Sequence, residues 1–224
     1  MKLCALIAAY NEAANIAQVV RGCAPLVDEV LVVDDGSSDE TTQIAEAAGA
    51  TVIVHQRNAG KGAAIRTGFD YVRGHEFDAV VLLDGDGQHD WREIPRFVEA
   101  AERTGAAIVL GDRMQDVAGM PALRRWTNRT TSRVLSRLAR QPISDTQCGF
   151  RLVRTRVLAD LDLKTANYET ESEMLVQAAL AGHRIEDLPI TTIYNAAPSD
   201  IHAVRDTWRF IRLVVRTWWQ RKRP

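Results

Sequence analysis

Residues 80–89 read VVLLDGDGQH, an apolar run that ends in two carboxylates separated by one glycine. A short apolar run predicts a buried strand, and in open α/β sheets ligands bind just outside the carboxyl ends of strands. The two acids, Asp84 and Asp86, repel each other unless positive charge lies between them. Oxygen ligands of this kind suit Mg²⁺ or Mn²⁺, which take further ligands from water and substrate phosphates. The pattern therefore predicts a divalent metal holding a phosphorylated ligand, and the alternative is a solvated turn.

The composition is that of one large domain, or of one domain with an appendage. The chain has 224 residues, of which 46% are hydrophobic, enough to bury a sizeable core. Three cysteines form no CxxC pair, so neither a disulfide framework nor a zinc site is indicated. No apolar run approaches the roughly 20 residues that span a bilayer, and Asn11-Glu12 ends the apolar start too early for a signal peptide. We therefore expect a cytoplasmic protein.

Charge is distributed unevenly along the chain. Residues 1–112 hold 9 Lys+Arg and 18 Asp+Glu, whereas residues 113–224 hold 19 and 11, so the net charges are −9 and +8. The second half is therefore expected to face an anionic partner, and the candidates are phosphates, nucleic acid or a membrane surface.

The first half alternates strand-like apolar runs with helical patterns. The expected strands are residues 3–9, 29–33, 51–54, 79–83 and 106–110. Strands separated by helices predict right-handed crossovers and a mostly parallel sheet covered on both faces. The carboxyl ends of such strands converge on one rim, and three of these strands end in polar residues: Tyr10-Asn11-Glu12, Asp34-Asp35-Gly36-Ser37 and the acid pair of residues 84–86.

After Gly111 the pattern changes. We expect a long basic helix at 121–140, a loop and short strand at 145–153, a helix at 168–181, a strand at 185–193 and a last helix at about 203–221. We interpret residues 1–200 as one α/β domain and residues 201–224 as an amphipathic C-terminal helix.

Gly60-Lys61-Gly62 is not a P-loop, because the preceding glycine and the following Ser/Thr are missing.

Four short motifs follow one another along the first half. They are AYNE at 9–12, VVDDGSSD at 32–39, NAGKG at 58–62 and LDGDGQH at 83–89. In this order they resemble the motifs of family 2 glycosyltransferases, most closely the branch of dolichyl-phosphate mannose synthase and polyprenyl-phosphate glycosyltransferases. The stretch DTQCGFR at 145–151 resembles a further motif of that branch, with Cys148 where serine is more usual. The resemblance runs from about Leu3 to Tyr194.

This resemblance implies a GT-A fold, a nucleotide-sugar donor linked to GDP or UDP, and Mg²⁺ or Mn²⁺ as cofactor. The residues it assigns to the donor nucleoside are Tyr10, Glu12 and one of Asp34 and Asp35. Those it assigns to the metal and the donor pyrophosphate are Asp84, Asp86 and Gln88, and Lys61 adds positive charge to the donor site. Arg113 and Arg124 match positions that hold phosphate charge, and Asn128 stands beside them on the acceptor side. The catalytic candidates are Asp86, Arg113 and Arg124.

The acceptor decides whether a general base is needed. A phosphate monoester has a second pKa of about 6, so a lipid phosphate is largely ionised at neutral pH and can attack without a base. A sugar hydroxyl requires one, and the candidates are then Asp145, Glu171 and Glu173. We favour a polyprenyl or dolichyl phosphate acceptor, because the basic helix lies on the expected acceptor side, and the resemblance implies inversion at the sugar carbon. Arg133, Arg137 and Arg140 can equally form a solvated face.

The last predicted helix has an amphipathic pattern. Its apolar stripe consists of Val204, Trp208, Ile211, Val215, Trp218 and Trp219, and a flank of arginines runs beside it. This pattern is typical of a helix that lies on a membrane surface. The alternative is packing on the sheet or on a second subunit of a homodimer, so peripheral membrane attachment and dimerisation both stay open.

Two other functions fit less well. A nucleotidyltransferase of the same fold usually carries a glycine-rich loop with a basic residue after the first strand, and this chain has Tyr10-Asn11-Glu12 there. A basic nucleic-acid-binding module would leave the acid pair unexplained, and no recognised nucleic-acid motif appears. We therefore expect no nucleic-acid partner.

Overall fold

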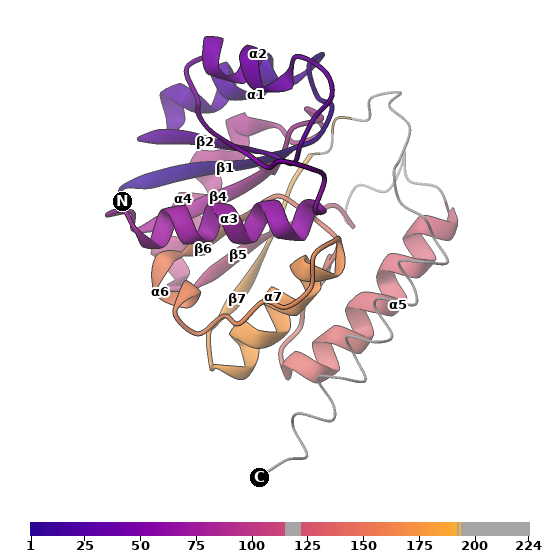
Figure 1. The fold of residues 1–224 in the computed structure, drawn as a ribbon. Helices are drawn as coiled ribbons and strands as arrows, with labels where there is room; N and C mark the ends of the chain where they lie inside the picture. The colour runs from indigo at the N-terminus through magenta and orange to yellow at the C-terminus, as the bar shows by residue number, and fades with distance from the viewer. Residues whose placement is uncertain (115–121, 192, 194–224) are drawn as a thin grey trace.

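The structure, a computed structural model, describes residues 1–114, 122–191 and 193, and only the backbone of residues 122–124. Within these residues the strands are β1 (Leu3–Ala9), β2 (Glu29–Asp34), β3 (Thr51–Val54), β4 (Ala79–Asp84), β5 (Ile108–Asp112), β6 (Arg151–Arg154) and β7 (Ile185–Pro189). The helices are α1 (Ile16–Cys23), α2 (Thr41–Ala47), α3 (Lys61–Arg73), α4 (Ile94–Thr104), α5 (Ala122–Ala139), α6 (Thr155–Leu158) and α7 (Glu169–Leu180). Figure 1 shows one sheet with helices packed around it.

The sheet has the strand order β3-β2-β1-β4-β6-β5-β7. The chain runs outward from β1 to β2 and β3, then returns to place β4 on the other side of β1. This reversal is the topological switch point at which α/β sheets bind ligands. In the register, Ala9 pairs with Asp34 and Ala8 pairs with Asp84. The polar ends of β1, β2 and β4 therefore reach the same rim, as the sequence predicts.

One strand departs from the expected parallel pattern. β6 runs antiparallel to both β4 and β5, with Arg151 opposite Leu82. Because the two directions oppose each other, the start of β6 lies beside the end of β4. Residues 145–150, which precede β6, are thereby brought to the acidic rim. The mostly parallel sheet flanked by helices is confirmed, and this insertion is what joins the second half of the chain to the site.

Small residues let α3 pack closely on its neighbours. A Cβ added at Gly68 would lie 2.3 Å from Leu6 Cδ1 of β1, and one at Gly62 would lie 1.9 Å from Thr170 Oγ1 of α7. Larger side chains would push α3 away from the sheet or from α7. The glycine at position 62 of the NAGKG motif therefore has a packing role, and it helps to place Lys61 at the rim.

The long basic helix is present as α5, which packs against α7 at the edge of the molecule (Figure 1). Its buried side carries Asn128, Ser132, Leu135 and Ala139. None of the helices in the described part of the chain is long and apolar enough to cross a bilayer. The predicted C-terminal helix, and with it the division at residue 200, lies outside the described residues.

Candidate active site

An ion pair between Lys61 and Asp84 forms the centre of the rim. Lys61 begins α3, Asp84 ends β4, and Lys61 Nζ lies 2.6 Å from Asp84 Oδ1. Burial disfavours the charged carboxylate, but the Lys61 ammonium outweighs burial and lowers the pKa of Asp84 to about 2. Burial likewise opposes the ammonium, yet Asp84 and then Glu171 raise the pKa of Lys61. Both groups are therefore charged at neutral pH.

The backbone of Gly149 lies close to this ion pair, at a position where a side chain would collide with it. A Cβ at this position would lie 2.9 Å from Asp84 Oδ2 and 3.1 Å from Lys61 Nζ. Glycine is used where a backbone must approach another group this closely. The loop before β6 therefore closes over the Asp84 carboxylate, which is a direct consequence of the antiparallel direction of β6.

The charges continue from Lys61 into the protein interior. Glu171 Oε1 lies 3.2 Å from Lys61 Nζ and 3.7 Å from Arg151 Nη2. Arg151 is fully buried, and it donates hydrogen bonds to the backbone carbonyls of Cys148 and Glu171. Charges thus alternate from Arg151 through Glu171 and Lys61 to Asp84, so each has an opposite neighbour, as buried charges require. We call these four residues the charge chain.

Sequence reasoning missed most of the charge chain. It treated Glu171 only as a candidate base and assigned no role to Arg151. A signal was available, because a lone arginine in the short strand pattern at residues 151–153 is expected to have a partner if the strand is buried. The partner itself could not be named from the sequence, because Glu171 lies 20 residues further along the chain.

Asp86 and Gln88 lie in the turn that follows β4. The Gln88 backbone N–H donates to Asp86 Oδ1 at 2.9 Å. Burial, and after it the charge of Asp84, raise the pKa of Asp86. A cation beside both carboxylates would counter that shift. Two carboxylates and an amide oxygen are hard oxygen donors, so the residues present fit Mg²⁺ or Mn²⁺.

The protein alone does not form a complete metal cage in the part of the chain that the structure describes. No three His, Cys, Asp or Glu side chains gather there in a metal-binding arrangement. Mg²⁺ is commonly bound through one or two carboxylates and completes its shell with water and substrate phosphates. The set of Asp84, Asp86 and Gln88 is therefore suited to a metal that is shared with a diphosphate, and this assignment stays a prediction.

Asp34 and Asp35 lie under the rim and are buried. Asp34 accepts one hydrogen bond from the Ser37 backbone N–H, in the loop before α2, and one from the Thr42 hydroxyl in the first turn of α2. Asp35 accepts from the backbone N–H groups of residues 59–60 at 2.9 and 2.7 Å, and pairs with His55 Nδ1 at 2.7 Å. Both carboxylates therefore hold the loops of the rim together, a role that sequence reasoning did not assign. Their contact with a nucleoside stays a prediction.

The loop after β1 carries Tyr10 and Glu12. Tyr10 is 43% exposed at the rim, where an aromatic ring can stack on a base. The Glu12 backbone N–H donates to Thr41 Oγ1, which ties the loop to α2. A Cβ at Gly85 would lie 3.2 Å from Glu12 Cγ, so this loop also adjoins the turn after β4. The structure thus brings together the three polar strand ends that the sequence placed on one rim.

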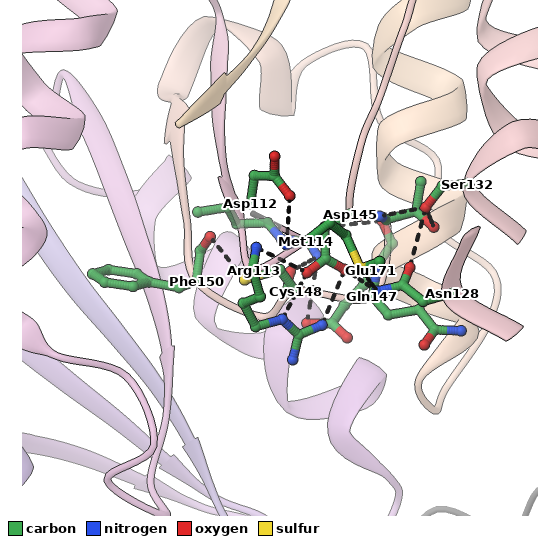
Figure 2. A network of polar contacts seen from close by, with 12 residues as sticks. Asp112, Arg113, Met114, Asn128, Ser132, Asp145, Gln147, Cys148, Phe150 and Glu171 are labelled. Atoms are coloured by element: carbon green, nitrogen blue, oxygen red, sulfur yellow. Dashed lines mark hydrogen bonds and ion pairs between the residues drawn. The ribbon is translucent and has the colours of Figure 1, made fainter. Parts of the chain in front are cut away.

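A second cluster connects β5, α5 and the loop before β6. Arg113 Nε donates to Asp145 Oδ2 at 2.7 Å, and Arg113 Nη2 donates to Oδ1 at 3.0 Å. Asn128 points from α5 to the same carboxylate and donates to Oδ1 at 2.7 Å (Figure 2). Burial would raise the pKa of Asp145, but the Arg113 guanidinium outweighs burial and lowers it. We call Arg113, Asn128 and Asp145 the arginine corner.

The arginine corner adjoins the charge chain. Arg113 is among the cations that lower the pKa of Asp84, and the buried Cys148 interacts with Arg113 of the corner and with Arg151 of the chain. Burial raises the pKa of the Cys148 thiol to about 12, so the side chain packs as a neutral group. Arg124 is in the first turn of α5, but its side chain is outside the described residues, and its predicted role stays a prediction.

Comparisons with known proteins agree with this architecture. Residues 4–162 match the family model of glycosyl transferase family 2. The chain is 33% identical over 214 residues to glycosyltransferase AglJ of Haloferax volcanii, covering 91% of this chain and 68% of AglJ. It is 32% identical over 192 residues to dolichyl-phosphate hexose transferase of the same organism, covering 84% and 81%. It is 30% identical over 209 residues to undecaprenyl-phosphate mannosyltransferase of Micrococcus luteus, covering 86% and 84%.

Solved structures show the same fold. Glucosyl-3-phosphoglycerate synthase of Mycobacterium tuberculosis, in complex with Mg²⁺ and UDP, superposes with a TM-score of 0.70 at 22% identity, covering 98% of this chain and 79% of that one. At this identity the likeness concerns the fold alone. The sheet, its switch point and the polar rim have the α/β architecture of the GT-A fold. The chain belongs to glycosyl transferase family 2 and is a glycosyltransferase.

Proposed function

We propose that this glycosyltransferase moves a sugar from a GDP- or UDP-linked donor to a polyprenyl or dolichyl phosphate, with Mg²⁺ or Mn²⁺ and with inversion at the sugar carbon. The two relatives described as dolichyl-phosphate hexose transferase and undecaprenyl-phosphate mannosyltransferase support this acceptor class. The oxygen ligands after β4 support the metal. The structural neighbour that holds Mg²⁺ and UDP supports a nucleotide donor.

The donor side is formed by the rim. Tyr10 would stack on the base, with Glu12 beside it, and the loops held by Asp34 and Asp35 would surround the nucleoside. Asp84, Asp86 and Gln88 would hold the cation together with the pyrophosphate. When bound, the cation supplies a Lewis acid and template that stabilises the departing diphosphate. Lys61 lies beside Asp84 and adds a positive charge to the same place.

One observation carries the choice of acceptor: all three candidate bases are engaged in other interactions. Asp145 is fully buried against Arg113 and Asn128. Glu171 lies next to Lys61 in the charge chain. Glu173 is buried and accepts hydrogen bonds from the backbone of residues 164–165. A hydroxyl acceptor needs a base, whereas an ionised phosphate does not.

The arginine corner fits a phosphate acceptor. The two hydrogen bonds to Asp145 take the Nε donor and one Nη2 donor of Arg113 and fix the plane of its guanidinium. A guanidinium has five N–H donors in a rigid plane, so the other donors would be the ones that meet a phosphate. Arg113 would thus orient the acceptor phosphate and offset the repulsion between that anion and the donor diphosphate. Arg124 and Asn128 would complete the acceptor side.

A membrane-embedded acceptor also bears on location. We propose a peripheral protein on the cytoplasmic face of the membrane, with residues 201–224 as one contact. Homodimerisation stays a prediction, and a sedimentation measurement of the full chain tests it.

Two measurements test the proposed function. The first is a thermal-shift panel of UDP, GDP and their sugars with and without Mn²⁺, in which we expect one nucleotide to stabilise the protein only when the metal is present. The second follows transfer from that sugar nucleotide to a short polyprenyl phosphate in detergent, with the matching polyprenol and a free sugar as controls. Transfer to the phosphate with release of the nucleoside diphosphate supports the proposal. Transfer only to a hydroxyl acceptor, or release of pyrophosphate, would contradict it.

A further inference from the structure

His89 closes the turn that follows β4. It is the last residue of the LDGDGQH motif, and neither the proposed donor site nor the arginine corner uses it. The residue is only 5% exposed, and its side chain reaches back to the start of its own turn. The Asp84 backbone N–H donates to His89 Nδ1 at 3.2 Å. The ring thus joins the two ends of the segment that carries Asp84, Asp86 and Gln88.

This hydrogen bond decides which nitrogen of the imidazole carries the proton. A backbone N–H can only donate, so His89 Nδ1 holds a lone pair, and the proton of the neutral ring is then on Nε2. A metal needs a lone pair on its ligand atom, and in this tautomer neither nitrogen offers one. His89 can therefore influence a bound metal only through the backbone of Asp84 and not as a ligand.

The face of the His89 ring packs on the loop before β6. His89 stacks on Phe150 with ring centroids 5.2 Å apart and an interplanar angle of 23°, and Phe150 packs in turn on Phe97 of α4 at 4.3 Å. Both phenylalanines are fully buried. Phe150 directly follows Gly149, whose backbone lies against the Asp84 carboxylate. The stack therefore fixes the plane of the imidazole and holds Nδ1 against the turn.

The backbone of this turn needs such a constraint. Glycines lie on both sides of Asp86, and Gly87 has a φ of 72°, a conformation that other residues rarely adopt. β4 pairs with β6 only as far as Leu82, two residues before Asp84. His89 thus restrains the turn beyond the point where the ladder with β6 has ended. Mg²⁺ demands near-octahedral geometry, so the direction of each carboxylate matters for its binding.

We infer that His89 is a positioning residue for the metal site, whose Nδ1 holds the Asp84 backbone so that the carboxylates of Asp84 and Asp86 point to one cation. This inference deepens the proposed function and rests on it, because it takes the turn as the place where the metal meets the diphosphate. Partners that orient metal ligands contribute about 10–100-fold to metal affinity. A residue that only fills the core would change stability on substitution and leave metal affinity unchanged.

Two substitutions at position 89 separate the hydrogen bond from the stack. His89→Asn places a carbonyl oxygen near the position of Nδ1, so it keeps an acceptor for the Asp84 N–H and loses the aromatic ring. His89→Phe keeps a ring against Phe150 and loses the acceptor. The readout is the apparent Mn²⁺ dissociation constant of the full chain at a fixed concentration of UDP or GDP, measured by calorimetric titration with the titration into nucleotide alone subtracted. We expect His89→Phe to bind Mn²⁺ about 30-fold more weakly than wild type, and His89→Asn to lie within about threefold of wild type.

Phe97→Leu is the matched control. It disturbs the same aromatic stack from α4 and leaves the hydrogen bond between His89 and Asp84 in place. Urea unfolding measures the loss of stability in all three variants, and we expect Phe97→Leu to be destabilised without a change in Mn²⁺ binding. ¹⁵N NMR of the histidine-labelled wild type adds a measurement that needs no variant to fold. It should show Nδ1 of His89 without a proton and Nε2 with one.

The outcomes separate this inference from the proposed function. Equal Mn²⁺ binding by His89→Phe and wild type would overturn the inference, and so would equal weakening in His89→Phe, His89→Asn and Phe97→Leu. A proton on Nδ1 would overturn it as well, because the Asp84 N–H could not then donate to that atom. Wild-type protein without Mn²⁺-dependent nucleotide binding would refute the proposed donor site and this inference together. Normal Mn²⁺ binding with transfer only to a hydroxyl acceptor would refute the proposed acceptor and leave this inference standing.

Discussion

The charge chain and the arginine corner hold buried charge by different means. In the charge chain, Asp84 meets the single ammonium of Lys61 at 2.6 Å, on a flexible four-carbon stem. In the arginine corner, Asp145 meets the planar guanidinium of Arg113 through two hydrogen bonds and accepts a third from Asn128. A lysine can move away when a cation and a diphosphate arrive, whereas a bidentate arginine pair is fixed before any ligand binds. We therefore interpret the first as an adaptable donor site and the second as a preformed acceptor site.

The largest effect is expected for Asp86→Ala, which tests the assignment of the donor site. Removal of one oxygen ligand should abolish the metal-dependent stabilisation by nucleotide and lower kcat by about 10³-fold, since groups that stabilise charge developing in the transition state contribute on this scale. The unfolding temperature of the ligand-free variant should stay close to that of wild type, because Asp86 lies in the turn after β4. Thermal shift with and without Mn²⁺, followed by initial rates, measures both effects. Asp162→Ala, at an exposed carboxylate, is the control. Unchanged metal-dependent stabilisation in Asp86→Ala would contradict the donor-site assignment.

The second test is Asp145→Asn, which breaks the preformed corner. The variant leaves Arg113 without its carboxylate, and removal of one partner of a buried ion pair costs about 3 kcal/mol or more of unfolding free energy. Because the pKa of Asp145 is lowered in the folded protein, its contribution is present above the ordinary carboxyl pKa of about 3.9 and is lost as pH falls through the lower folded-state pKa. Urea unfolding from pH 7 down to pH 3 should show a weaker acid dependence in the variant. A variant as stable as wild type at pH 7 would show that the corner is not structural.

The third test, Arg124→Ala, addresses the acceptor side alone. Donor binding should be spared, because Arg124 is on α5 and the donor residues are on the rim. Transfer to polyprenyl phosphate should fall by about 10²-fold, the scale expected when a charged group that orients a reactant is removed. The nucleotide thermal shift measures donor binding and the initial rate measures transfer, and the neighbouring Arg125→Ala variant is the control for both. Equal turnover in Arg124→Ala and wild type would count against the assignment.

The smallest expected effect is that of Lys61→Met. Lys61 competes with a cation for Asp84, so its removal should raise the Mn²⁺ affinity of the nucleotide-free protein by about tenfold. The same change should weaken binding of the nucleoside diphosphate, because a positive charge beside its phosphates is lost. Calorimetric titration with Mn²⁺ alone and then with nucleotide resolves the two directions, with Lys164→Met as an exposed control. Weaker Mn²⁺ binding in the absence of nucleotide would mean that Lys61 supports the metal instead of competing with it.

Many elements of the fold could be predicted from sequence, in both halves of the chain. β1 spans residues 3–9 as expected, and α5 falls within one residue of the expected helix at each end. These elements have strong local patterns, apolar runs between turn residues in one case and a helical period in the other. The antiparallel direction of β6 was not predicted, because strand direction depends on which neighbour the chain meets and not on the residues of the strand.

The candidate site could be predicted only in part, because local motifs give the position of a residue along the chain and not its partners in space. The motifs placed Tyr10, Glu12 and the acid pair on one rim, and the register of β1 with β2 and β4 confirms that grouping. The motifs did not show that Asp35 is used to hold the loop of residues 59–60, or that Asp145 is used to hold Arg113. A buried acid is given its role by its partners, which lie far away in sequence.

The sequence by itself determined the family, the order of the elements and the edge of the sheet at which the polar residues gather, because these follow from local periodicity and from motifs of adjacent residues. Only the tertiary structure decided which charges meet. The Arg151–Glu171–Lys61–Asp84 chain joins β6, α7, α3 and β4, and the contact between Gly149 and Asp84 exists only because β6 runs against β4. Electrostatic interactions between buried groups depend on distance in space and on the loss of water around them, and neither quantity is encoded in the spacing of residues along the chain.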